Sequence, residues 1–264
     1  MLAQKILQLA ILSAKNPIEC FDRVCTFLEV RRDPFLKRPY DYKLTEWRQV
    51  LRGLGHCLGR SMNEIIQEPG LIEIENKVGS LVESGLVRSP FRTSHNADFA
   101  LARLCYLVCR GLRPKVVLET GVAHGVTSAF ILQALAVNGH GVLHSVDLPP
   151  LGAHGDDFVG ILIPPDLRSN WCLHRGTSKR ILPRLLASLA AVDIFVHDSL
   201  HTYRHMGWEF RTVTPFLTRR CAIISDDVDG NAAFSDYLAS SGPTFSFVAR
   251  EEKKESLFGA SIRC

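Results

Sequence analysis

From Arg113 onward, short runs of β-forming residues alternate with helical stretches, and this rhythm constrains the fold more than any other feature. Strands are predicted at residues 115–119, 142–147, 171–175, 192–198 and 221–226. Helical patterns lie between them, near residues 127–138, 178–190, 206–217 and 230–240. Strands that alternate with helices favour a parallel sheet with helices on both faces.

The chain closes with two further strand patterns, at residues 244–249 and 256–262, separated by the charged turn 250–255. Two strands joined by so short a turn must run antiparallel. The sequence therefore predicts an α/β fold with a mostly parallel sheet of seven strands and an antiparallel C-terminal hairpin. An ordinary dinucleotide-binding sheet is parallel throughout.

The first part of the chain reads as helices. Asn16 and Pro17 provide an N-cap and a first-turn proline for a helix that closes near residues 31–34, and Thr45 is expected to cap the next helix. Asn96 or Ser94 is expected to cap a helix over residues 97–110. We divide the chain into a helical extension, residues 1–94, and a catalytic domain, residues 95–264. The extension would cap the active site or mediate homo-oligomerisation.

Charge and cysteine content narrow the class of protein. Residues 1–113 hold 17 Lys and Arg against 12 Asp and Glu, a surplus too small and too dispersed to predict nucleic-acid binding. The eight cysteines form no CxxC pair, and several lie in apolar runs, so we expect reduced thiols and a cytoplasmic protein. No run reaches the ~18 apolar residues of a membrane span.

The first predicted strand leads into a glycine-containing turn at residues 119–128. Gly121 allows a tight exit from the strand, and Gly125 allows the next helix to begin close to a ligand. Glu119, at the strand end, suits a cationic ligand better than a pyrophosphate. The turn as a whole contributes these cofactor candidates: Glu119, Gly121, Ala123, His124, Gly125, Thr127 and Ser128.

Two further strand ends face the same edge of the predicted sheet. Asp147 ends the second strand, where a carboxylate can accept both hydroxyls of a ribose. After the third strand, Gly176, Thr177 and Ser178 are placed to border an adenine, although a plain helix cap explains this loop equally well.

Three carboxylates follow the fourth and fifth strands. Asp198 ends one strand, and Asp226 and Asp227 end its expected neighbour. Carboxylates gathered at one sheet edge repel each other unless a cation lies among them, and oxygen ligands of this kind suit Mg²⁺. His201, three residues beyond Asp198, is placed to take a proton from a substrate hydroxyl. The plainer interpretation is that these are solvated capping residues and a structural histidine.

Taken together, residues 119–125, Asp147, residues 176–178, the segment DSLHTY at 198–203 and SDD at 225–227 resemble class I S-adenosylmethionine-dependent methyltransferases. The likeness covers about residues 95–264 and is greatest to the metal-dependent sugar and natural-product O-methyltransferases of the macrocin and mycinamicin type. It implies a Rossmann-like fold, an S-adenosylmethionine cofactor, Mg²⁺ on Asp198, Asp226 and Asp227, and His201 as base. Ala123 departs from the family's usual glycine, and Leu200 stands where some relatives carry a second aspartate.

The resemblance implies an enzyme that methylates a hydroxyl of a small molecule or glycan. Two alternatives stay open: a metal-independent methyltransferase that acts on another nucleophile, and a non-catalytic partner protein that keeps the fold. Activity that survives EDTA would favour the first. Retention of Glu119, Asp147 and the three aspartates argues against the second. A nicotinamide oxidoreductase is disfavoured because the chain lacks GxGxxG after its first strand.

Overall fold

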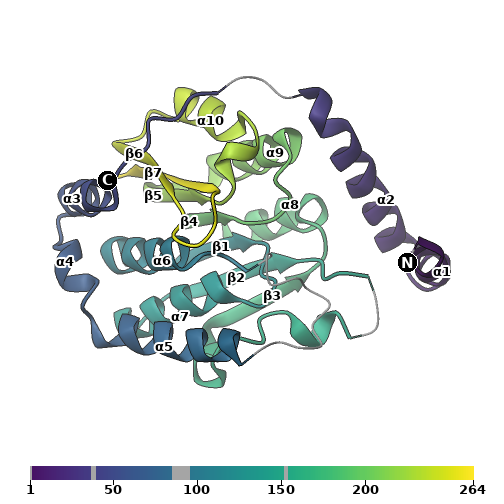
Figure 1. Ribbon diagram of the computed structural model, residues 1–264, viewed down its shortest axis with the longest axis horizontal. Helices are drawn as coiled ribbons and strands as arrows, with labels where there is room; N and C mark the ends of the chain where they lie inside the picture. Colours follow the sequence, from purple (N-terminus) through teal and green to yellow (C-terminus); the bar gives the residue numbers. More distant parts are fainter. Residues whose placement is uncertain (1, 37–39, 85–95, 152–153) are drawn as a thin grey trace.

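Seven strands form one mixed sheet in the computed structural model, which describes residues 2–36, 40–84, 96–151 and 154–264 (Figure 1). The strands are β1 (Val116–Thr120), β2 (Val142–Asp147), β3 (Trp171–Arg175), β4 (Val192–His197), β5 (Leu217–Ser225), β6 (Phe245–Arg250) and β7 (Leu257–Arg263). Their order across the sheet is β3-β2-β1-β4-β5-β7-β6. The first five are parallel, and β7 is antiparallel to both neighbours. The predicted sheet and its C-terminal hairpin are confirmed.

The described residues form ten α-helices, which are α1 (Leu2–Lys15), α2 (Pro17–Arg32), α3 (Trp47–Leu58), α4 (Met62–Ile65), α5 (Pro69–Glu83), α6 (Phe99–Leu112), α7 (Val126–Asn138), α8 (Ser178–Leu189), α9 (Tyr203–Val213) and α10 (Ala233–Ser241). None of these helices is long and apolar enough to cross a lipid bilayer.

The alternation of side chains along each strand divides the core into two layers. Val117 of β1 packs in a cluster with residues of α6 and α7, whereas Leu118 packs on the other face with residues of α8 and α9. Glu119 therefore shares the α7 face, and Thr120 shares the α9 face. Both clusters are continuous across β1, β4 and β5, so the carboxyl ends of these strands are held rigidly.

The N-terminal helices fall into two groups. Helices α3, α4 and α5 contribute buried residues to the same cluster as α6 and α7, whereas α1 and α2 contribute none to either cluster. Figure 1 shows α1 and α2 at the outer side of the molecule. The proposed division between residues 94 and 95 lies outside the described residues.

Three predicted helix boundaries are wrong. Glu46, not Thr45, is the N-cap of α3, because the Thr45 backbone N–H instead donates to the Val248 carbonyl (2.8 Å). Asp98 caps α6, its side chain accepting from the Ala100 N–H (2.8 Å), so this helix begins later than expected. Helix α9 ends at Val213, ahead of a proline-containing 3₁₀ turn, and not at residue 217.

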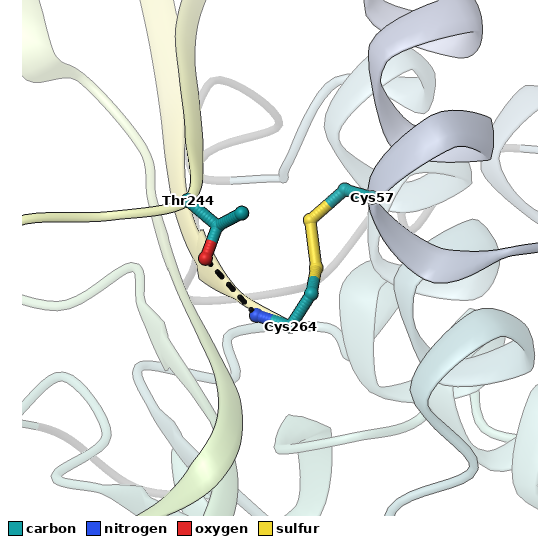
Figure 2. Close-up of a disulfide and its surroundings, with 3 residues drawn as sticks. All are labelled: Cys57, Thr244 and Cys264. Atoms are coloured by element: carbon teal, nitrogen blue, oxygen red, sulfur yellow. Dashed lines mark hydrogen bonds between the residues drawn. A yellow bond between two sulfur atoms is a disulfide. The ribbon is translucent and has the colours of Figure 1, made fainter.

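The prediction that the cysteines are all reduced is wrong for Cys57 and Cys264, which form a disulfide (Figure 2). Cys57 lies on α3, and Cys264 follows β7. Because α3 packs against β6, the neighbour of β7, the two Cα atoms come within 5.9 Å. The Cys264 N–H also donates to Thr244 Oγ1 (3.3 Å). This bond removes the cysteine argument for a reducing compartment. Three cysteines are buried free thiols, as expected: Cys105, Cys109 and Cys221.

Removing this disulfide is expected to destabilise the chain measurably. It closes a loop with a sequence separation of 207, and crosslinks of this kind typically contribute about 2–4 kcal/mol by restricting the unfolded state. Cys57→Ser combined with Cys264→Ser should lower the free energy of unfolding by about that amount in urea titrations. The exposed free thiols offer a matched control, since Cys25→Ser with Cys172→Ser should leave stability unchanged. Equal stability of all three proteins would contradict the expectation.

Candidate active site

The turn after β1 brings two strand ends into direct contact. Gly121 has φ +83°, and a Cβ placed on it would lie 1.8 Å from the Asp198 carbonyl oxygen. The Asp198 N–H in turn donates to the Thr120 carbonyl (2.8 Å). Only glycine permits this approach, so the turn and the position of Asp198 are set together.

Glu119 is fully buried at the end of β1, and its oxygens are engaged within the protein. They accept hydrogen bonds from Thr127 Oγ1 (2.7 Å), Ser128 Oγ (2.6 Å) and Ser145 Oγ (2.7 Å). Burial raises the pKa of Glu119, and the three hydroxyls oppose that rise. In this structure the carboxylate ties β1 to β2 and to the first turn of α7, the turn that would receive the cofactor.

Asp147 reaches the glycine turn from the end of β2. Its Oδ2 accepts from the backbone N–H groups of Val122 (2.7 Å) and Ala123 (2.9 Å). Burial raises its pKa, while the two N–H donors lower it. The sequence-predicted ribose ligand therefore lies at the turn, with its second oxygen bonded to neither N–H.

A second layer of residues packs on the same turn. The N–H groups of Gly160 and Leu162 donate to the carbonyls of Ala123 (3.0 Å) and His124 (2.9 Å). Nδ1 of the buried His124 lies 2.5 Å from Asn96 Oδ1. Gly160 and Leu162, which lie between β2 and β3, thus border the glycine turn.

The loop after β3 is held by helices rather than exposed to solvent. The Gly176 N–H donates to the Asp147 carbonyl (2.8 Å), which keeps the loop beside the ribose-binding candidate. Thr177 Oγ1 donates to Asp22 of α2 (3.4 Å), and Ser178 Oγ lies 2.9 Å from Nε2 of the buried His205. The structure brings residues 176–178 to the same edge as Asp147 and the glycine turn.

Three side chains lie close together at the ends of β4 and β5. Two of them, Asp198 and Asp226, are among the three carboxylates that the sequence suggested as metal ligands. Ligand atoms of Asp198, His201 and Asp226 all lie within 4.8 Å of one another. Asp226 Oδ1 and His201 Nε2 are buried and have no hydrogen-bond partner among the described residues. Unpartnered buried polar atoms of this kind are costly, so the donor set fits a divalent cation.

Asp227, which we predicted as a third metal ligand, contacts the histidine. Its Oδ2 lies 2.8 Å from His201 Nδ1. The residue has φ +45°, a left-handed conformation that aspartate tolerates and that turns its side chain toward His201. This contact leaves His201 Nε2 as the atom that faces Asp198, 3.8 Å from Oδ1.

The electrostatics of this cluster are strongly coupled. Burial, with the neighbouring Asp226 charge, raises the pKa of Asp198 well above its usual range. Burial likewise raises the pKa of Asp226. Burial alone would lower the pKa of His201, but its hydrogen bond to Asp227 and the charge of Asp226 raise it overall. A cation between these two carboxylates would favour their charged forms.

Two buried glutamates near the site, Glu209 and Glu251, were not predicted from the sequence. Glu209 of α9 is fully buried, with Oε2 2.6 Å from His197 Nδ1 and Oε1 2.9 Å from His205 Nε2. It also accepts from Thr120 Oγ1 (2.7 Å), so it fixes the ends of β1 and β4 beneath the site. The spacing of His205 and Glu209, one helical turn apart, was the sequence pattern that could have indicated this contact.

Glu251 is the second of these glutamates. Burial and the Asp226 charge raise its pKa to about 7.

Residues 118–228 match the sequence model of a family described as Methyltransferase domain, a stretch that runs from β1 to just beyond β5. This stretch holds every proposed cofactor, metal and catalytic residue. This stretch, which is less than half of the chain, resembles a methyltransferase domain. No curated protein sequence matches the chain significantly.

Solved structures extend the likeness to a larger part of the chain. An O-methyltransferase from Bacillus cereus in complex with SAH matches with TM-score 0.56 at 13% identity, covering 81% of this chain and 97% of that one. The O-methyltransferase TomG from Streptomyces achromogenes, involved in tomaymycin synthesis and in complex with SAM, matches with TM-score 0.54 at 15% identity, covering 75% and 91%. These likenesses show the methyltransferase fold. With the domain match, they support an S-adenosylmethionine-dependent methyltransferase.

Proposed function

We propose that the chain is an S-adenosylmethionine-dependent O-methyltransferase that uses a divalent metal, with Mg²⁺ as the expected ion. The observation that carries the proposal is the convergence of Asp198, His201 and Asp226 next to the glycine turn. This edge of the sheet would therefore hold the cofactor and the cation next to each other. Similar solved structures with bound SAM or SAH support the cofactor.

Asp198 and Asp226 would hold the metal, which supplies Lewis-acid chemistry by lowering the pKa of an acceptor hydroxyl. The chain's own residues do the rest. The glycine turn, Asp147 and residues 176–178 would orient the cofactor so that its methyl group faces the acceptor oxygen. His201 Nε2 would take the hydroxyl proton, while Asp227 holds the imidazole from Nδ1 and stabilises its protonated form.

The acceptor class that we propose is a hydroxyl of a sugar, glycan or small natural product. A cation held by Asp198 and Asp226 would favour an acceptor whose oxygen atoms can bind it, such as a molecule with two adjacent hydroxyls. One of the similar structures belongs to an enzyme of natural-product synthesis, which is consistent with this class.

His201→Gln tests the role of the histidine. A base contributes about 10²–10⁴-fold to a rate, so kcat should fall by that factor with a diol acceptor, and Mn²⁺ affinity should stay within about threefold. Asp227→Asn should lower kcat by a smaller factor, because it removes only the group that orients the ring. If the His201→Gln variant instead lost its affinity for Mn²⁺, the histidine would be a metal ligand and not the base. Activity that survives EDTA would contradict the proposal that the reaction uses a divalent metal.

A further inference from the structure

Helix α2 is oriented with its charged side toward the protein. Glu19 pairs with Arg175 (2.6 Å), and Asp22 pairs with Arg180 (2.6 Å). The other two carboxylates of this region also bond to the body of the chain, as follows: Glu29 to Lys179 and Thr202, and Asp33 to the Tyr203 N–H. All of these partners lie at or after the carboxyl ends of β3 and β4. Polar contacts therefore dock α2 onto the edge of the sheet that carries the proposed site.

The opposite side of α2 is apolar and faces solvent. We call it the outer face, and it consists of Phe21, Val24, Phe27 and Leu28. Ile18 and Val30 are also exposed, but helical spacing places them at the edges of the charged side. Phe21 is 65% exposed, and Phe27 is 56% exposed. With Ile11 of α1, this region holds seven of the thirteen large hydrophobic residues that are exposed in the described chain. Scattered exposed apolar residues are ordinary, but a concentration of this kind marks an interaction surface.

The exposed charged residues of α2 and of the described end of α1 are all positive. Lys15, Arg31 and Arg32 are exposed, and the Arg31 guanidinium lies 4.8 Å from the centre of the Phe27 ring. Every carboxylate between residues 8 and 34 is turned inward to the partners described above. Apolar side chains bordered by Lys and Arg suit an anionic lipid surface. A second copy fits less well, because a two-fold interface through this face would bring like charges together.

We propose that the outer face of α2 docks the protein on an anionic lipid surface. Phe21, Phe27 and Leu28 would enter the boundary between headgroups and acyl chains, while the arginines contact lipid phosphates. The polar contacts of the inner side hold α2 on the sheet edge, so docking would bring the proposed site close to the lipid. The lipid-binding step itself does not depend on the proposed methyl transfer.

Sedimentation with vesicles tests this surface on the full-length chain. We expect binding to vesicles of phosphatidylcholine mixed with phosphatidylglycerol, weaker binding to phosphatidylcholine alone, and a loss of affinity in high salt. Phe21→Ser with Phe27→Ser should weaken the binding by about tenfold or more. Arg31→Glu with Arg32→Glu should reduce binding to the anionic vesicles only.

Ile72→Ser on α5 is the matched control, because Ile72 is also half exposed but lies away from α2. It should bind vesicles like the unmodified chain, and superimposable thermal melts should confirm that all the variants are folded. Equal binding by the Phe21/Phe27 double variant and the unmodified chain would overturn the proposal. A second result would also overturn it. If the unmodified chain bound no vesicles but formed a stable dimer in light scattering, and the double variant were monomeric, the outer face would join two copies of the chain.

Discussion

Gly121→Ala is expected to be the most damaging single-methyl change in the chain. The added Cβ would lie 1.8 Å from the Asp198 carbonyl oxygen, in a backbone conformation that alanine disfavours. Left-handed backbone costs about 1–2 kcal/mol, and overpacking adds about 1–3 kcal/mol, so the free energy of unfolding should fall by about 3 kcal/mol. Urea denaturation measures this loss. Binding of S-adenosylhomocysteine should fall with it, since relief of the clash moves the glycine turn away from Asp198.

Gly79→Ala is the matched control for this prediction. Gly79 lies within helix α5, and a Cβ there would meet no atom within 4 Å. Because alanine is the better helix former, the control should be neutral or up to about 1 kcal/mol more stable. If Gly121→Ala proved as stable as the control, the close approach of β1 and β4 would not exist as described.

Asp226→Asn is expected to abolish most of the metal-dependent activity. The substitution keeps the side-chain size but removes the charge of a buried ligand candidate. Its Oδ1 has no hydrogen-bond partner in the part of the chain that the structure describes. Metal catalysis stabilises a transition state by several kcal/mol, so kcat/KM should fall about 10²–10³-fold. Mn²⁺ affinity, followed by electron paramagnetic resonance, should fall at least about tenfold, whereas S-adenosylhomocysteine affinity should change little.

The exposed Asp166 gives a control of the same chemical change. It lies in a 3₁₀ turn and pairs only loosely with Lys77 (3.4 Å). Asp166→Asn should leave both metal binding and activity as they are. Unchanged Mn²⁺ affinity in Asp226→Asn would remove Asp226 from the metal site, and with it the argument from the converging side chains.

The strand ends could be predicted from the sequence because a glycine or an aspartate interrupts the apolar run at each of them. Gly121 marks the exit from β1, and Asp147 and Asp226 mark the exits from β2 and β5. Parallel strands place all such residues at one edge. The contact between Asp227 and His201 was not predictable, because it depends on a left-handed backbone at Asp227 that a run of two aspartates does not reveal.

Other features depended on contacts between distant parts of the chain. The disulfide joins residues separated by 207 positions, and their meeting follows from the packing of α3 against the terminal hairpin. Glu209 appears in sequence as one acidic residue on an amphipathic helix. Its role becomes visible only when β1 and β4 bring Thr120 and His197 onto its carboxylate. Short-range patterns thus located the edge of the sheet, whereas the network beneath it needed the three-dimensional structure.

Calorimetric titration with S-adenosylhomocysteine tests the central claim most directly, because it needs no knowledge of the acceptor. We expect one site per chain with micromolar affinity, in EDTA as well as in Mg²⁺, because the glycine turn and Asp147 belong to the protein and not to the metal. A separate Mg²⁺ signal should appear in the unmodified chain and disappear in Asp226→Asn. Absence of any nucleoside binding to the folded chain would contradict the assignment as a methyltransferase.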